Sequence, residues 1–231
     1  MAKINRRKLA VLILVCLVIL LVPASLTIDK GRVRANLSER GPLGFNNLMA
    51  DILWVEAIQY LGEAKTITDE IATTIYQKIE RITELDPHFI MAYRLAGLTL
   101  TDKRPDLSIR ILSKGLENNP GASWEIPFYA GVVSYFWLKD YREAVRYLEA
   151  ATAYPECPDF IERFLARATT EVGSYKDALL LWEGIYEGTE SSTERGIAVR
   201  HLIRLCSQIM ETPLDKQLVA KAKATLRKIS E

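Results

Sequence analysis

The sequence predicts an all-α protein, a solenoid of antiparallel helix pairs preceded by one N-terminal transmembrane helix. Three observations lead to this prediction. Apolar residues recur at helical spacing from about residue 48 onward, while the alternation typical of strands is scarce. Small residues recur at intervals of about 34 residues, which is the length of a helix-pair repeat. The first 30 residues carry a disproportionate share of the apolar side chains in a chain that is 49% hydrophobic.

The transmembrane helix is predicted in residues 1–29. Every residue from Leu9 to Val22 is apolar, and after Lys8 no charge appears before Asp29. A helix of this uncharged stretch is roughly 30 Å long, enough to cross the hydrocarbon core of a bilayer. The alternative is a cleaved signal peptide, since the segment has a basic start and the small residue Ala24 near its end.

Both interpretations carry the rest of the chain across a membrane. Four cations precede the apolar segment, at Lys3, Arg6, Arg7 and Lys8, and they favour a cytoplasmic N-terminus. In a bacterium, we therefore expect a single-pass inner-membrane protein whose C-terminal body is periplasmic. Residues 30–47 are polar, contain glycine and have no periodicity, so we expect a linker.

The charge balance excludes one class of partner. The whole chain has 30 basic and 29 acidic side chains. Four of the basic and one of the acidic side chains lie in residues 1–29, which leaves 26 and 28 in the body. A mildly acidic body lacks the basic surface of a nucleic-acid-binding protein, so no nucleic-acid partner is expected.

The repeat is marked by Gly97, Gly131 and Ala166, which are 34 and then 35 residues apart. After each of them comes a triplet of small or apolar residues with spacings of four and three, which places the triplet on one helical face. The triplets are Ser108, Leu112 and Gly115; Ala144, Leu148 and Ala151; and Ala178, Trp182 and Ile185. Pro120 and Pro155 close the first two units.

This arrangement resembles the tetratricopeptide repeat (TPR), in which two antiparallel helices occupy about 34 residues and a small eighth residue marks where they meet. The best match runs from Ser123 to Pro155, and a degenerate earlier unit spans about 48–87. The resemblance covers about residues 48–188 and implies a right-handed superhelical solenoid. We place the repeat region at 48–190 and expect residues 191–231 to form capping helices that cover the last hydrophobic face.

The resemblance also implies a binding groove along the first helices of the pairs. In the family, positions two, five, nine, twelve and thirteen of a repeat commonly face this groove. Aromatic side chains flanked by arginines suit a protein or peptide ligand that is acidic or ends in a carboxylate. The matching residues are Met91, Arg94, Leu98 and Thr101; Glu125, Phe128, Val132, Tyr135 and Phe136; and Phe160, Arg163, Arg167, Thr170 and Glu171.

Little in the chain suggests catalysis. It has two His and three Cys, and neither His88 nor His201 lies near a recognisable nucleophile. We therefore expect no catalytic residues, no cofactor and no metal site. The leading hypothesis is a non-enzymatic, membrane-anchored TPR protein that docks or scaffolds other proteins, chiefly membrane-associated ones. The alternative is a permanently bound accessory subunit of a larger membrane protein complex.

Overall fold

The computed structural model describes residues 45–211 and 215–230, and these ranges are helical apart from short connections. The N-terminal membrane anchor predicted at 1–29 lies outside the described residues. The helices are α2 (Asn46–Glu63), α3 (Asp69–Leu85), α4 (Ile90–Leu100), α5 (Pro105–Asn118), α6 (Glu125–Val133), the π-helix η2 (Ser134–Leu138), α7 (Tyr141–Thr152), α8 (Phe160–Val172), α9 (Tyr175–Gly188), α10 (Ser192–Glu211) and α11 (Lys216–Ser230).

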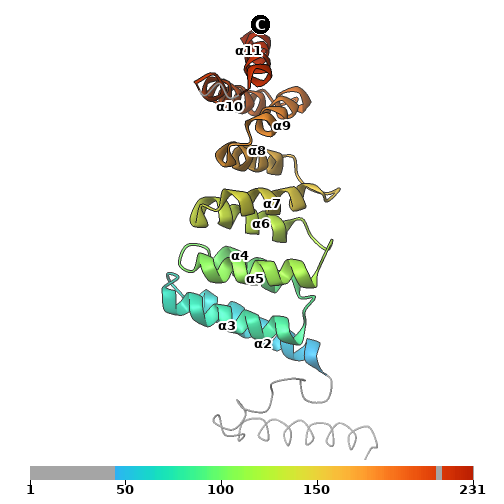
Figure 1. Ribbon diagram of the computed structural model, residues 1–231. Coiled ribbons are helices and arrows are strands. Elements are labelled where there is room, and N and C mark those ends of the chain that lie inside the picture. Colours follow the sequence, from blue (N-terminus) through green and yellow to red (C-terminus); the bar gives the residue numbers. More distant parts are fainter. Residues whose placement is uncertain (1–44, 212–214, 231) are drawn as a thin grey trace, which may run out of the picture. The chain divides into compact units, whose positions relative to one another are not determined.

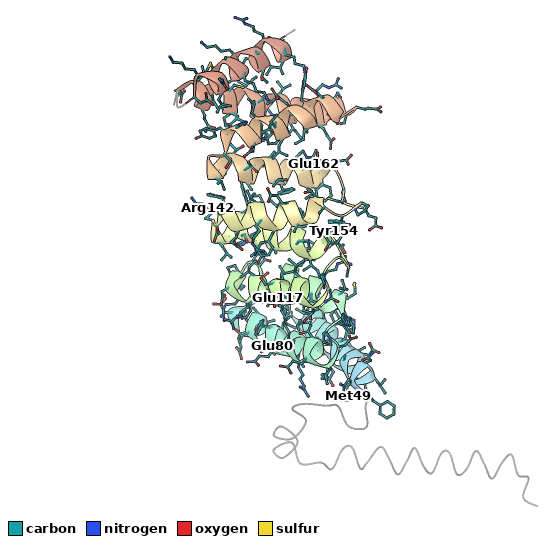
Figure 2. All side chains as sticks on the ribbon, turned by 45° about the vertical axis from the view of Figure 1, so that its right-hand side comes forward. Met49, Glu80, Glu117, Arg142, Tyr154 and Glu162 are labelled. Carbon is teal, nitrogen blue, oxygen red and sulfur yellow. The ribbon has the colours of Figure 1, made fainter. Side chains whose placement is uncertain are left out.

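Each helix from α3 onward packs mainly against the next helix in the chain, and the stack runs in chain order (Figure 1). Side chains fill the spaces between successive helices (Figure 2). Residues 50–231 form one compact unit, and the described part of the other unit is residues 45–49, where α2 begins. Packing between chain neighbours is the defining property of a solenoid, and it matches the predicted fold class of helix pairs.

Local signals in the sequence set the helix boundaries. The Thr68 hydroxyl accepts a hydrogen bond from the Ile71 amide at 3.3 Å, and the Asp140 carboxylate accepts one from the Glu143 amide at 3.1 Å. Such caps satisfy amides that have no partner within the helix. Pro105 is the first residue of α5, where its missing N–H costs no hydrogen bond. Gly173 ends α8 with a φ of 86°, which only glycine adopts without strain.

The small residues of the repeat lie where the two helices of a pair meet, as the sequence predicted. A Cβ added at Gly97 would lie 2.7 Å from Cδ2 of Leu112, and one added at Gly131 would lie 2.6 Å from Cγ of Leu148. Ala166, at the corresponding position of the next pair, is completely buried. The three predicted triplets are buried as well. The periodic small residues therefore permit close packing of the helices within each pair.

The π-helix η2 is a feature that the sequence pattern did not indicate. It continues α6 for five residues, and the Asp140 amide donates to the Ser134 carbonyl at 3.0 Å beyond its end. Lys139 then takes a left-handed conformation with a φ of 55°. A π-helical turn rotates the residues that follow it relative to a continuous α-helix, and such turns are frequent at functional sites. Here η2 sets the direction in which the side chains of Tyr135 and Phe136 leave the helix.

The C-terminal part continues the stack with α10 and α11, which are close to the two predicted capping helices. Leu202, Leu205 and Ile209 of α10 are buried against α9 and α11 in one hydrophobic cluster. The Thr225 hydroxyl of α11 donates to the Glu183 carboxylate at 2.5 Å, and Lys221 pairs with the same carboxylate at 2.9 Å. These contacts connect α11 to α9.

The predicted linker extends slightly into the first described helix. Helix α2 begins at Asn46, within the segment predicted as a linker at 30–47. Among residues 45–211 and 215–230, no helix combines the length and the apolar character needed to cross a bilayer.

Candidate protein-binding surface

Two of the predicted groove arginines connect successive helix pairs through ion pairs. Arg94 of α4 lies 2.6 Å from the Glu125 carboxylate of α6, and Arg163 of α8 lies 2.5 Å from the Glu194 carboxylate of α10. In each case the acid follows the arginine by 31 residues, so the same contact recurs between different pairs. These arginines are partly buried and already neutralised, and their charges are less available to a ligand than the sequence suggested.

The predicted residues of α4 divide between the surface and the interior. Met91 and Leu98 are exposed, with 51% and 58% of their surface accessible. Thr101, in contrast, is only 8% exposed, and its hydroxyl donates to the Gly97 carbonyl and lies 3.4 Å from the Ser108 hydroxyl. The Thr101 side chain therefore completes the contact between α4 and α5 and does not line an open groove.

The predicted aromatic centre is partly interior packing. The Phe128 ring lies 5.5 Å from the rings of both Phe160 and Phe164, with near-perpendicular planes, which is the preferred edge-to-face geometry. Phe128 and Phe160 belong to the periphery of a hydrophobic cluster between α7 and α8, and Val132 is half-buried. Phe136 alone of the predicted aromatics is substantially exposed, at 41%.

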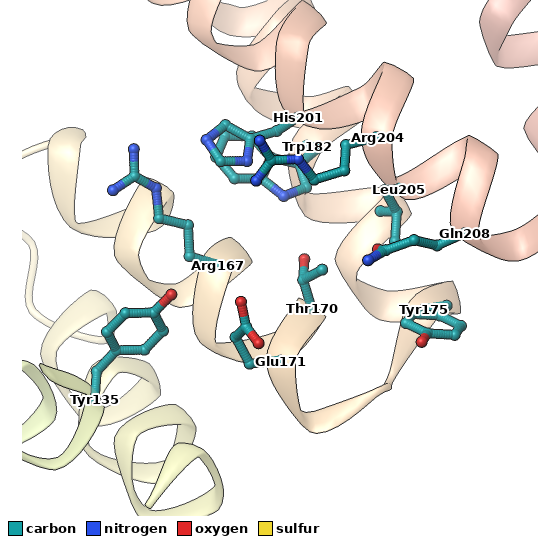
Figure 3. A pocket seen from close by; sticks show the side chains of 10 residues that line it. All are labelled: Tyr135, Arg167, Thr170, Glu171, Tyr175, Trp182, His201, Arg204, Leu205 and Gln208. Carbon is teal, nitrogen blue, oxygen red and sulfur yellow. The ribbon is translucent and has the colours of Figure 1, made fainter. Parts of the chain in front are cut away.

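The remaining predicted residues meet in one pocket of about 440 Å³ between η2, α8, α9 and α10, which we call the α8–α10 pocket (Figure 3). The predicted members Tyr135, Arg167, Thr170 and Glu171 form one side of it. The sequence reasoning missed the other members, which are Tyr175 and Trp182 of α9 and His201, Arg204, Leu205 and Gln208 of α10. Arg163, one turn before Arg167, lines a different pocket, which also contains Glu194.

An aromatic stack forms part of the wall of the α8–α10 pocket. The His201 ring lies parallel to the Trp182 indole, with ring centroids 4.2 Å apart and planes inclined by 3°. Trp182 is completely buried, which agrees with its expected packing role, and it belongs to the cluster of α9, α10 and α11. Helix α9 thus supplies the inner wall, and α10 covers it with the imidazole.

The electrostatics of this pocket are dominated by cations. Burial, followed in order by the nearby charges of Arg167, Arg204 and Arg200, lowers the pKa of His201 to about 4. The imidazole is therefore neutral at physiological pH. Across the pocket, burial and the Glu171 carboxylate raise the pKa of the Tyr135 hydroxyl, so the phenol keeps its proton. Glu171 is the acidic residue that lines the pocket.

The described residues offer donors and acceptors for binding more than groups for covalent chemistry. Within residues 45–211 and 215–230, no cluster of three or more His, Cys, Asp or Glu side chains could hold a metal ion. Cys206 is buried within α10, and burial raises the pKa of its thiol to about 11. A thiol with such a pKa is a poor nucleophile.

Comparisons with known proteins bear on the fold. No protein-family model and no curated protein matches the chain. Among solved structures, one described as "Crystal structure of MamA protein" matches with a TM-score of 0.52 and 15% identity, covering 78% of this chain and 91% of that one. A second, "Crystal structure of MamA", has a TM-score of 0.47 at 16% identity, covering 70% and 90%.

A further match, "MamA MSR-1 C2", has a TM-score of 0.40 at 20% identity and covers 60% of this chain and 88% of that one. The first match, together with the helix-pair packing described above, shows that this chain has an all-α, TPR-like helical fold. Its particular partners have to be argued from its own surface, because a shared scaffold does not carry a shared ligand.

Proposed function

We propose that this chain is a non-enzymatic scaffold that binds other proteins along the first helices of its repeats. The observation that carries the proposal is the α8–α10 pocket, where side chains of three successive helix pairs meet around unpaired cations. A surface assembled from several repeats suits an extended polypeptide better than a compact substrate. The TPR-type fold favours protein partners in the same way.

The proposal includes a membrane tether and an extracytoplasmic body. It places residues 1–29 as a single-pass anchor with the N-terminus in the cytoplasm, and in a bacterium the repeats in the periplasm, on the basis of the apolar segment and the four preceding cations. A tether would raise the effective concentration of a weak binding surface near membrane-associated partners. Protease added to intact spheroplasts should digest the repeats; full protection of the repeats would refute the proposed location.

Capture of partners from native membranes tests the scaffold itself. Arg167→Glu should greatly reduce capture, because it replaces an unpaired cation in the pocket by an anion next to Glu171. Arg163 is a poorer choice for charge reversal, since a carboxylate there would face Glu194 and disturb the contact between α8 and α10. Unchanged recovery of the same proteins by the Arg167→Glu variant would refute the binding surface.

A second candidate, the permanently bound accessory subunit, is favoured by an exposed apolar stripe on α2. Leu48, Ile52, Val55 and Ile58 recur at spacings of three and four residues, and each is between 41% and 55% exposed. Such a stripe is typical of a helix that packs against another protein. After solubilisation in mild detergent, a band of monomer size on a native gel would exclude a fixed complex, and a large co-migrating assembly would support it.

A further inference from the structure

The α8–α10 pocket contains buried polar atoms that have no partner in the described chain. They are Nε of Arg167, Nε1 of Trp182 and Oε1 of Gln208, one from each of the three helices. Buried polar groups are nearly always hydrogen-bonded, and one left unsatisfied costs about 1–3 kcal/mol. Two donors and one acceptor that lack partners in the same pocket indicate that a polar group from another molecule belongs there.

The charges in this pocket indicate that the missing polar group is negatively charged. Arg94 and Arg163 each pair with the acid 31 residues later, whereas no ion pair joins Arg167 or Arg204 to any acid of the described residues. The residue 31 positions after Arg167 is Ala198, and His201 of the same helix is neutral, so α10 supplies no compensating charge at either position. Two unpaired guanidinium groups beside a donating indole N–H form an environment for an anion.

We propose that the α8–α10 pocket binds a carboxylate group, with Arg167 and Arg204 as its charged contacts and the Trp182 indole N–H as a further donor. Glu171 also lines the pocket, and its negative charge disfavours a doubly charged phosphate relative to a single carboxylate. The unpartnered Gln208 oxygen is then free to accept an N–H adjacent to that carboxylate. At a chain terminus or at an acidic residue, a polypeptide carries a carboxylate close to a backbone N–H, so the group is carried by a polypeptide, in keeping with the proposed function on which this part rests.

Nuclear magnetic resonance of the full-length chain tests the site through its own residues. The indole N–H of Trp182 and the ring protons of His201 are followed during titration with five probes: sodium acetate, inorganic phosphate, N-acetyl-dialanine with a free carboxyl terminus, N-acetyl-aspartate α-amide, and the uncharged N-acetyl-dialanine amide. Both signals should shift saturably with acetate and more tightly with at least one of the charged peptides. The apparent pKa of His201 should rise on binding, because the carboxylate offsets the arginine charges.

Variants separate binding from folding. Arg167→Gln and Arg204→Gln should each weaken binding about tenfold, since each removes one charge-assisted contact. Arg204→Lys keeps the charge and should retain part of the affinity. Arg142→Gln is the matched control, because Arg142 is exposed on α7 and extends outward from the stack (Figure 2). The affinity of this variant for the carboxylate probes should stay within about twofold of that of the wild type. Far-ultraviolet circular dichroism verifies that each variant is folded.

The outcomes are separable. Equal binding of the neutral amide, tighter binding of inorganic phosphate, or unchanged affinity in folded Arg167→Gln and Arg204→Gln variants would overturn the carboxylate site. If neither charged peptide bound more tightly than acetate, the proposal that a polypeptide carries the carboxylate would be wrong. If one of them binds more tightly than the other, it identifies the source of the carboxylate as a chain terminus or an acidic side chain. Carboxylate binding without partner capture from membranes would leave the site intact and refute the scaffold.

Discussion

Replacement of Gly131 by Ala tests the close approach of α6 and α7 that the repeat pattern predicts. The added Cβ would lie 2.6 Å from Cγ and 2.9 Å from Cδ2 of Leu148. Carbon atoms in contact are about 3.5–4.0 Å apart, so the helices or Leu148 must shift by about 1 Å. Leu148 is completely buried and Cγ is not the end of its side chain, so the shift is costly.

The magnitude follows from two opposing effects. Overpacking of this kind costs about 1–3 kcal/mol, and Ala regains about 1 kcal/mol of helix propensity over Gly. The difference between them is a net loss of up to about 2 kcal/mol in the free energy of unfolding. Gly184→Ala is the matched control, because Gly184 lies within α9 and a Cβ there meets nothing within 4 Å. It should gain about 0.5–1 kcal/mol from the same change in propensity.

Urea denaturation of the full-length chain, followed by far-ultraviolet circular dichroism, measures both variants against the wild type. The two substitutions are chemically identical, so only their surroundings distinguish them. The midpoint should fall for Gly131→Ala and rise for Gly184→Ala. If Gly131→Ala stabilised the protein as much as Gly184→Ala does, the helices would not meet at Gly131, and the packing argument for the repeat would be wrong.

Three further predictions concern charge and burial. The free energy of unfolding should fall by about 2 kcal/mol as the pH drops from about 6.5 to about 4, because His201, with its pKa lowered to about 4, binds its proton more weakly in the folded than in the unfolded state. Urea denaturation of the wild type and of His201→Phe at several pH values measures this fall. An identical fall in the variant would exclude His201 as the cause. A double-mutant cycle of Arg94→Gln and Glu125→Gln should give a coupling energy of about 0.5–1 kcal/mol, and strictly additive effects would mean that the ion pair contributes nothing. Cys157 is half-buried and should react with iodoacetamide well before Cys206, which is completely buried and whose thiol has a pKa of about 11. Equal reaction rates of the two thiols in the folded protein would contradict the burial of Cys206.

The helix-pair architecture was predictable because burial leaves a periodic record in the sequence. Gly131, Ala144 and Leu148 are small or apolar at the spacing that places them on facing surfaces, and the structure brings them into contact. Thr101 shows the limit of this reasoning. Its repeat position predicts a groove residue, but a short hydroxyl side chain within a helix can turn back to the carbonyl four residues earlier, and Thr101 does so at Gly97.

The binding surface was predictable only in part, because a pocket depends on which helices meet. Tyr135, Arg167 and Thr170 were chosen from their repeat positions, and all three line the α8–α10 pocket. The missed residues lie on α9, which is the second helix of its pair, and on α10, which the sequence pattern assigned to a cap. Groove positions were therefore counted on neither helix. Continuing the count at about 34 residues beyond Arg167 reaches His201, and this was the available signal.

The charge of the surface could not be read from residue types alone. Arg163 and Arg167 have equal formal charge and lie one helical turn apart, yet Arg163 pairs with Glu194 while Arg167 faces a neutral imidazole. That difference depends on where α10 places Glu194 and His201 beside α8, and α10 is positioned by its packing against α9 and α11. Local sequence carries no direct record of it.

Site-specific photocrosslinking in native membranes tests the central proposal most directly. A benzophenone-bearing side chain is introduced at Thr170, which lines the α8–α10 pocket, and in a second variant at Arg142 on the exposed side of α7. We predict discrete protein adducts from position 170 that disappear when Arg167→Glu is added, and no such adducts from position 142. Identical adducts from both positions, or adducts from position 170 that persist with Arg167→Glu, would contradict a protein-binding surface centred on this pocket.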